Sequence, residues 1–205
     1  MSFRSITMRL ALRALAALHL VAIAACARGA QPSTATEQST AAAGEERFAV
    51  YDLAPSWRDQ YGAARPIASL AGRPVVMAMI YTHCNATCPL ILGEMKRIEH
   101  ADPGVALVLV SLDPDRDTPG RLAEYASSEG LSDRWTLLSG SDDDTRALAA
   151  TLGIRYRRIS AEELAHSNTL TLLDATGTIV HQEMGLGAGE AILRASRALP
   201  NRSNS

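Results

Sequence analysis

Cys84 and Cys88 are the residues in this sequence whose type and spacing most clearly suit chemistry, since they stand four positions apart. Thiolates are nucleophiles and metal ligands, and two of them form a disulfide when their Cα atoms lie roughly 4.4–6.8 Å apart. In a helix, residues four positions apart share a face and are separated by about 6 Å along the axis. If this segment is helical, the spacing fits a redox-active pair or a metal site. The alternative is two buried structural cysteines that behave as small apolar residues.

A metal held by this pair needs at least one further ligand. Two thiolates are soft donors that suit Cu(I), and they also suit zinc, which normally takes four ligands. The sequence has five histidines, which are His19, His83, His100, His166 and His181. We expect His83 to point away from its neighbour Cys84, and His100 to stabilise the end of a helix. His166 lies in the loop directly before a predicted hairpin, and His181 lies in the second strand of that hairpin.

The two cysteines lie between a predicted strand and a predicted helix. Residues 74–81 (PVVMAMIY) form a continuous apolar run, which is typical of a strand buried on both faces. Pro89 suits the first position of a helix that we expect over residues 89–100. In open α/β sheets, functional sites cluster at the carboxyl ends of the strands, where these cysteines are predicted to lie. The positive end of a helix also lowers the pKa of a thiol.

The rest of the chain alternates between strands and helices. We expect short extended pieces at 48–60 and 66–70, strands at 105–112, 135–138, 154–159, 168–173 and 178–184, and helices at 119–128, 141–153 and 188–199. Alternation of this kind predicts an α/β fold with a partly parallel sheet. The dicysteine helix start and the late hairpin and helix predict a thioredoxin-like plan, with a central mixed sheet flanked by helices and an N-terminal β extension. In this plan, the loop with His166 faces the cysteines.

Residues 1–25 have the pattern of an export signal. Arg4, Arg9 and Arg13 precede an apolar run that is too short to span a bilayer. The run ends in Ile-Ala-Ala directly before Cys26, as in a bacterial lipobox, which predicts cleavage there and a lipid on the cysteine sulfur. The alternative is an ordinary signal cut nearby, with Cys26 incidental. Lipidation predicts a protein anchored in the bacterial cell envelope, with its domain in the periplasm.

The remaining chain divides into a tether, one domain and a tail. Residues 26–46 are rich in Ala, Ser, Thr and Gln and are expected to form a flexible tether. Residues 47–200 suit one domain, and residues 201–205 are expected to be disordered. Removal of the three arginines of the signal takes the formal net charge from −2 to −5. A charge of this sign excludes a strongly basic nucleic-acid-binding protein.

An acidic loop follows the strand predicted at 105–112. Asp113, Asp115, Asp117 and Glu124 have the spacing of a calcium-binding loop, but Thr118 stands where that loop needs glycine. We therefore interpret the segment as a strand-to-helix loop with a helix cap.

Three ordered motifs resemble those of the Sco/SenC family. They are YTHCNATCP at residues 81–89, SLDPDRDTP at residues 111–119 and HSN at residues 166–168. The resemblance covers about residues 47–200 and implies a thioredoxin-like domain that binds one copper through Cys84, Cys88 and His166. It also implies membrane anchoring, in agreement with Cys26. The resemblance further places Asp113 at the same sheet edge as the cysteines, with a role beside the ligands or in docking a partner. Two features argue against a general oxidoreductase: the CxxxC spacing, and the lack of a proline between residues 159 and 173.

The resemblance leaves two functions open. The first is a copper metallochaperone that delivers copper to the copper-site subunit of cytochrome c oxidase or to another periplasmic target. The second is a thiol–disulfide reductase, which would use Cys84 and Cys88 as a redox pair without His166. In both cases a Cys84–Cys88 disulfide must be reduced, for example by a thioredoxin-like partner. The sequence does not decide whether the protein is an enzyme, and a third reading is a copper or redox sensor.

Overall fold

A computed structural model describes residues 49–53 and 56–200 of the chain. The predicted signal peptide at 1–25, the tether at 26–46 with Cys26, and the tail at 201–205 lie outside the described residues. Over the described part, none of the helices has the length and apolar character needed to cross a membrane.

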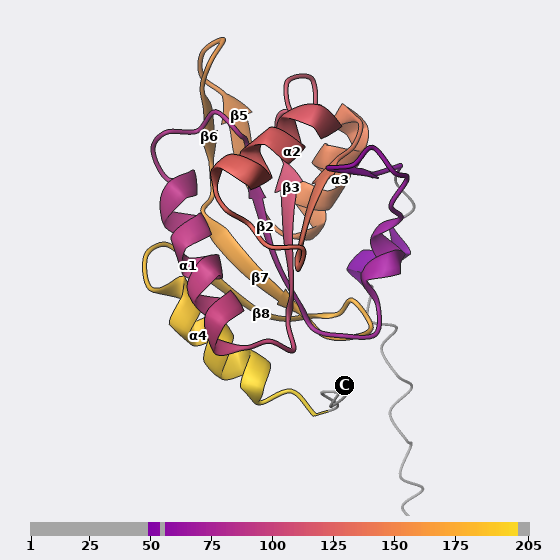
Figure 1. Cartoon of the computed structure of the whole chain (residues 1–205), viewed down its shortest axis with the longest axis vertical. Helices are drawn as coiled ribbons and strands as arrows, with labels where there is room; N and C mark the ends of the chain where they lie inside the picture. Colours follow the sequence, from indigo (N-terminus) through magenta and orange to yellow (C-terminus); the bar gives the residue numbers. More distant parts are fainter. Residues whose placement is uncertain (1–48, 54–55, 201–205) are drawn as a thin grey trace, which may run out of the picture. The chain divides into compact units, whose positions relative to one another are not determined.

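Six strands form a central mixed sheet in the order β1-β4-β3-β2-β7-β8 (Figure 1). They are β1 (Arg58–Asp59), β2 (Val75–Ile80), β3 (Ala106–Ser111), β4 (Trp135–Ser139), β7 (Thr169–Leu173) and β8 (Ile179–Met184). The strands β2, β3 and β4 run parallel, whereas β1, β7 and β8 are antiparallel to their neighbours. The sheet is thus partly parallel and closes with a hairpin, as the sequence predicted.

The strands β2 and β3 form the centre of the sheet, and every residue in both is buried. Their continuous apolar runs form strands because both faces of a central parallel strand are covered. The register runs from Val75 opposite Ala106 to Ile80 opposite Ser111. The two strands therefore end level, and the loops that follow them emerge at the same sheet edge.

Four helices flank the sheet: α1 (Cys88–Ala101), α2 (Pro119–Ser128), α3 (Asp142–Thr151) and α4 (Ala188–Arg197). Helices α1 and α4 pack against each other and α2 packs against β4, while Figure 1 shows α2 crossing in front of β3. The start of α3 is fixed by a capping box, in which Ser141 Oγ accepts a hydrogen bond from the Asp144 N–H at 3.1 Å. Local capping signals therefore predicted this helix start correctly.

The N-terminal extension is less extended than predicted. Residues 66–70 were expected to be extended but form the 3₁₀ helix η2 (Ile67–Leu70), and a second 3₁₀ helix, η1, covers Val50–Asp52. In a 3₁₀ helix, residues three apart lie on the same side, so Ile67 and Leu70 both bury their side chains. Among the described residues of this extension, β1 is the only strand, and it pairs with β4.

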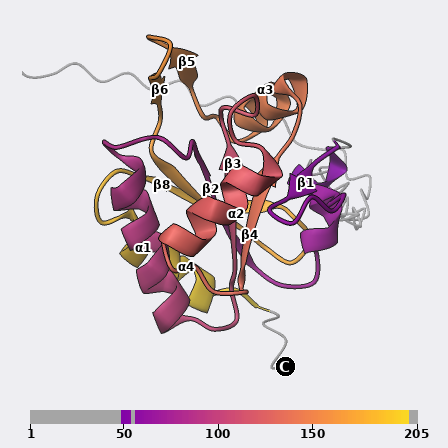
Figure 2. The same cartoon turned by 45° about the horizontal axis from the view of Figure 1, so that its top comes forward.

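A second sheet contains only β5 (Tyr156–Arg158) and β6 (Leu164–His166), and it stands out from the main sheet (Figure 2). The prediction that His166 lies in a loop was wrong, since it ends β6 and pairs with Tyr156. Residues 159–163 form the turn, where the Ile159 N–H donates to the Glu163 carbonyl at 2.9 Å. The short strand predicted at 154–159 is confirmed as β5, whereas β6 was not predicted, because three residues are too few to show an apolar alternation.

Candidate metal centre

Cys84 lies in the loop between β2 and α1, and Cys88 is the first residue of α1. The helical interpretation of the CxxxC segment was wrong, because α1 begins at Cys88 and Cys84 lies ahead of it. Pro89 lacks an N–H and fits only the first turn of a helix, which fixes the helix start at this point. The loop instead turns back on β2, where the Cys84 N–H donates to the Tyr81 carbonyl at 3.2 Å.

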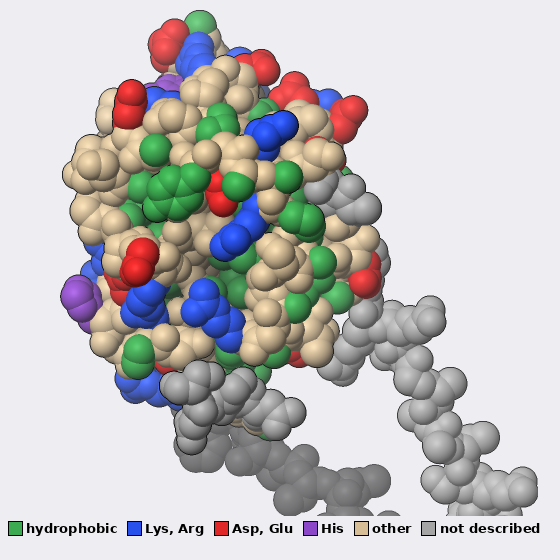
Figure 3. All heavy atoms as spheres, turned by 45° about the vertical axis from the view of Figure 1, so that its right-hand side comes forward, with side chains coloured by type: hydrophobic (Ala, Val, Ile, Leu, Met, Phe, Trp, Pro, Cys, Tyr) green, Lys and Arg blue, Asp and Glu red, His purple; other side chains and the backbone are tan. Residues whose placement is uncertain are grey.

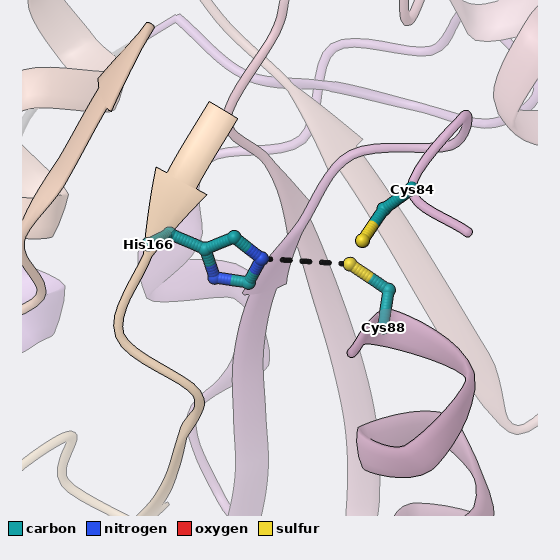
Figure 4. Close-up of side chains that lie close together, drawn as sticks. All are labelled: Cys84, Cys88 and His166. Atoms are coloured by element: carbon teal, nitrogen blue, oxygen red, sulfur yellow. Dashed lines mark hydrogen bonds between the residues drawn. The ribbon is translucent and has the colours of Figure 1, made fainter. Parts of the chain in front are cut away.

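Cys84, Cys88 and His166 meet at one point (Figure 4). One ligand atom from each lies within 4.8 Å of the others, and Cys88 Sγ is 3.6 Å from His166 Nε2. Both cysteines are free thiols and buried, whereas His166 is half-buried. Two sulfurs and one imidazole nitrogen form a soft donor set that fits Cu(I). A zinc ion would need a fourth ligand, and within the described residues this group contains only these three.

The orientation of His166 suits metal binding. Its Nδ1 lies 3.2 Å from the Ser167 carbonyl oxygen, which can only accept a hydrogen bond. Nδ1 must therefore carry the proton in the neutral ring, which leaves the lone pair of Nε2 directed at the thiols.

Tyr81 ties the cysteine loop to the strand that carries His166. Its hydroxyl donates to the Leu164 carbonyl at 3.2 Å and accepts from the Leu164 N–H at 3.4 Å. Its ring also packs edge-on against His166, with centroids 5.8 Å apart. No role of its own was predicted for Tyr81. The available signal was a tyrosine at the end of a buried strand, where its hydroxyl needs a partner.

Asp113 lies at the edge of the site, in the loop that follows β3. Its buried carboxylate accepts a hydrogen bond from Arg158 Nη2 at 2.7 Å and lies 3.6 Å from His83 Nε2. Arg116 Nη1 lies 3.1 Å from the same His83 nitrogen. His83 is thus engaged with Asp113 and Arg116, while Asp113 links the neighbour of Cys84 to β5. The contribution of Arg158 was not predicted from the sequence.

Asp117 uses both carboxylate oxygens to hold the ends of β2 and β3. It is fully buried, and it accepts hydrogen bonds from Thr82 Oγ1 and Ser111 Oγ, each at 2.6 Å. The Thr82 N–H donates to it as well, at 3.2 Å. These contacts make the acidic loop a structural joint between the ends of β2 and β3. The predicted helix cap is confirmed, since Thr118 Oγ1 accepts a hydrogen bond from the Arg121 N–H at 3.3 Å at the start of α2.

The two thiols differ strongly in acidity. Burial on its own would raise the pKa of Cys84, but hydrogen bonds from the Cys88 thiol and from the backbone of residues 86–88 outweigh it and lower the pKa to about 6. Burial raises the pKa of Cys88, and its hydrogen bond to Cys84 raises it further. At neutral pH, Cys84 is therefore a thiolate and Cys88 is the thiol that donates to it.

We expect the Cys88→Ala substitution to raise the pKa of Cys84, because it removes the thiol that donates to the thiolate. In a chain that also carries Cys26→Ala, the ultraviolet absorbance of the thiolate should titrate near pH 6 with Cys88 present. The midpoint should move toward the ordinary thiol value of about 8.5 in the alanine variant. The matched control is Cys88→Ser, which keeps a hydroxyl donor and should keep a lowered midpoint. An unchanged midpoint in Cys88→Ala would contradict this account.

A mixed sheet with two thiols and an imidazole at its carboxyl edge defines a thioredoxin-like domain with a soft-metal or redox site. Residues 50–199 match the model of the SCO1/SenC family. The chain belongs to this family, so the family and fold predicted from the sequence are confirmed.

Known proteins agree with this assignment. The SCO1 protein homolog of Bacillus subtilis is 25% identical over 145 residues, which cover 66% of this chain and 75% of the relative. Copper-bound ScoI of Bradyrhizobium japonicum is 26% identical with a TM-score of 0.59, over 71% of this chain and 97% of the other. The structure of BsSco is 22% identical with a TM-score of 0.62, over 75% and 96%. BsSco is described as a member of the Sco family of cytochrome c oxidase assembly proteins, and a disulfide switch was identified in it.

Proposed function

We propose that this protein is a copper metallochaperone that holds copper through Cys84, Cys88 and His166. The observation that carries the proposal is that these three donor groups lie within 4.8 Å of one another. Support comes from copper-bound ScoI, which is 26% identical. The proposed recipient is the copper-site subunit of cytochrome c oxidase or another periplasmic target, in line with the description of BsSco.

The side chains of Cys84, Cys88 and His166 account for how copper would be bound and released. Cys84 offers a thiolate at neutral pH, while Cys88 must lose its proton to bind, so copper affinity should rise with pH. The cysteines are buried and His166 is half-buried on a separate hairpin. Ligands from a recipient can therefore approach on the His166 side and exchange with the imidazole first.

We also propose that a lipid on Cys26 anchors the domain to the bacterial cell envelope, facing the periplasm. This part rests on the sequence alone, through the signal-like residues 1–25 and the lipobox pattern before Cys26. The mass of the mature N-terminal peptide tests it, since an unmodified Cys26 in the exported protein would exclude the anchor.

The acidity of Cys84 favours a second candidate, a thiol–disulfide reductase. A buried thiolate beside a thiol is the arrangement of a nucleophile and its resolving cysteine. In this reaction, Cys84 would attack a disulfide of a copper-site protein, and Cys88 would then displace the substrate thiol and close a Cys84–Cys88 disulfide. A thioredoxin-like reductant would have to restore both thiols. This function does not need His166, which separates it from the copper role.

Titration of the purified chain with Cu(I) tests the copper role directly. The reduced protein should bind one copper at this site. The protein with a Cys84–Cys88 disulfide should bind none there, because a disulfide offers no thiolate. The Cys84→Ser/Cys88→Ser double variant gives the background from other groups, Cys26 included. Equal copper binding by the reduced and oxidised proteins would rule out the proposed site.

A further inference from the structure

The outward face of the hairpin formed by β5 and β6 carries two arginines next to the metal site. Side chains alternate along a strand, so Arg155 and Arg157 lie on the face opposite to that of Tyr156. Tyr156 pairs with His166 and Arg157 pairs with Ala165. The two arginines therefore share one face of the hairpin, and His166 reaches the cysteines from the other.

These two arginines differ from most of the others in the chain. Over residues 49–53 and 56–200, the arginine side chains without a hydrogen bond or ion pair are those of Arg65, Arg73, Arg155 and Arg157. Both arginines of the hairpin are exposed. Their neighbours Arg116 and Arg158, by contrast, bind the carboxylates of Glu162 and Asp113. By the same alternation Glu163, which is exposed, lies on the outward face as well, so the face presents two arginines without an ion pair against one carboxylate and remains positive.

The arginines border a hollow that reaches the candidate metal ligand. Its volume is about 410 Å³, and residues 155–157 and 165–167 line it. A hollow of this size accommodates several side chains of a bound segment. The cationic groups and His166 therefore belong to one continuous surface.

The hairpin is held in place from its inner side. Arg158 binds Asp113 at 2.7 Å, and the Tyr81 hydroxyl binds the backbone of Leu164. Arg116 donates to the Ala161 carbonyl in the turn of the hairpin. A surface fixed in this way loses little conformational freedom when a partner binds.

The charge of the hairpin face contrasts with that of the whole chain, whose formal net charge is −2. Figure 3 shows a face of the molecule on which acidic and basic side chains are interspersed. A local positive surface on such a protein selects a partner with negative charge at the matching place.

We infer that this hairpin face docks an extended acidic segment of the protein that exchanges copper with the site. The inference rests on the proposed copper function and names the chemistry of the partner. Arg155 and Arg157 are two residues apart on a strand, or about 7 Å, which matches the spacing of alternate carboxylates on a second extended chain. Guanidinium groups bind carboxylates in a bidentate fashion. Because the hollow that the arginines border is also lined by His166, a segment docked there lies next to this candidate ligand.

A labelled peptide of eight residues that alternates glutamate and threonine serves as the probe, and the matching glutamine–threonine peptide is its control. At low salt, the glutamate peptide should bind the purified chain more tightly than the glutamine peptide. The Arg155→Gln/Arg157→Gln variant should bind the glutamate peptide about fivefold more weakly. The matched variant is Arg73→Gln, which removes an exposed, unpaired arginine at the start of β2, the other end of that strand from the site.

Equal binding of the two peptides, or an equal loss in Arg73→Gln, would overturn the docking surface. Copper titration of the same variants separates this outcome from failure of the proposed function. The Arg155→Gln/Arg157→Gln variant should bind copper like the unchanged chain, because neither arginine contacts a candidate ligand in the described structure. If the unchanged chain binds copper but not the glutamate peptide, the proposed docking surface is wrong and the copper function stands. If the unchanged chain binds the glutamate peptide but not copper, the proposed copper function is wrong and an acidic partner is supported.

Discussion

Replacing His166 with alanine will lower the affinity for Cu(I) by at least about 100-fold while the domain stays folded. Loss of a group that only orients a metal ligand typically costs 10–100-fold in affinity, so loss of a ligand should cost at least the upper value. The remaining thiols of Cys84 and Cys88 would leave copper with two protein donors. Competition with a chromophoric Cu(I) chelator measures the change.

The matched control for this prediction is His100→Ala. His100 is exposed in the last turn of α1, at the far end of the helix that begins with Cys88. It should leave the copper affinity unchanged, and both variants should keep the far-ultraviolet circular dichroism of the unchanged chain. Equal copper affinity in the His166 variant and the unchanged chain would exclude His166 as a ligand.

The same variant separates the two candidate functions. A thiol–disulfide reductase needs only Cys84 and Cys88, so His166→Ala should still reduce a disulfide substrate. If His166→Ala loses copper binding but still reduces the disulfide substrate, the two activities depend on different groups in the site. If His166→Ala still binds copper but no longer reduces the disulfide substrate, both the assignment of His166 as a ligand and the reductase mechanism are contradicted.

The candidate ligands could be predicted because their signals are local. Cys84 and Cys88 stand beside Pro89, which marks a helix start, and a buried strand is recognisable from the apolar run ahead of them. The ligand role of His166 was predicted from the order of the three Sco/SenC-like motifs and not from a local structural signal. The structure brings these three side chains together, although the helical spacing first suggested for the cysteines was not the reason.

The contacts that position the ligands could not be predicted, because they join residues far apart in the chain. Tyr81 meets Leu164 across 83 positions, and Asp113 meets Arg158 across 45. Neither pair leaves a periodic pattern in the sequence. The strand predicted at residues 154–159 corresponds to β5, but β6 and its pairing with β5 were not predicted, since β6 is only three residues long and partly exposed. The pairing of the hairpin with the site depends on these side-chain contacts.

The Asp117→Ala substitution will destabilise the domain by about 3 kcal/mol or more. It would leave the hydroxyls of Thr82 and Ser111, and the Thr82 N–H, without their buried acceptor. A buried donor that loses its partner costs about 1–3 kcal/mol, and a loss of this size is expected when a buried network is broken. Equilibrium unfolding in urea measures the effect.

The Asp115→Ala substitution is the matched control, because it makes the same chemical change two positions away on an exposed residue. Its effect should stay within about 0.5 kcal/mol. If Asp117→Ala does not fold, Thr82→Val tests the same joint with a smaller expected loss of about 1 kcal/mol. An effect of Asp117→Ala no larger than that of Asp115→Ala would mean that the joint is not needed for stability. Because Thr82 lies two residues before Cys84, a folded but weakened joint should also lower copper affinity, which links the stability of the sheet edge to the geometry of the site.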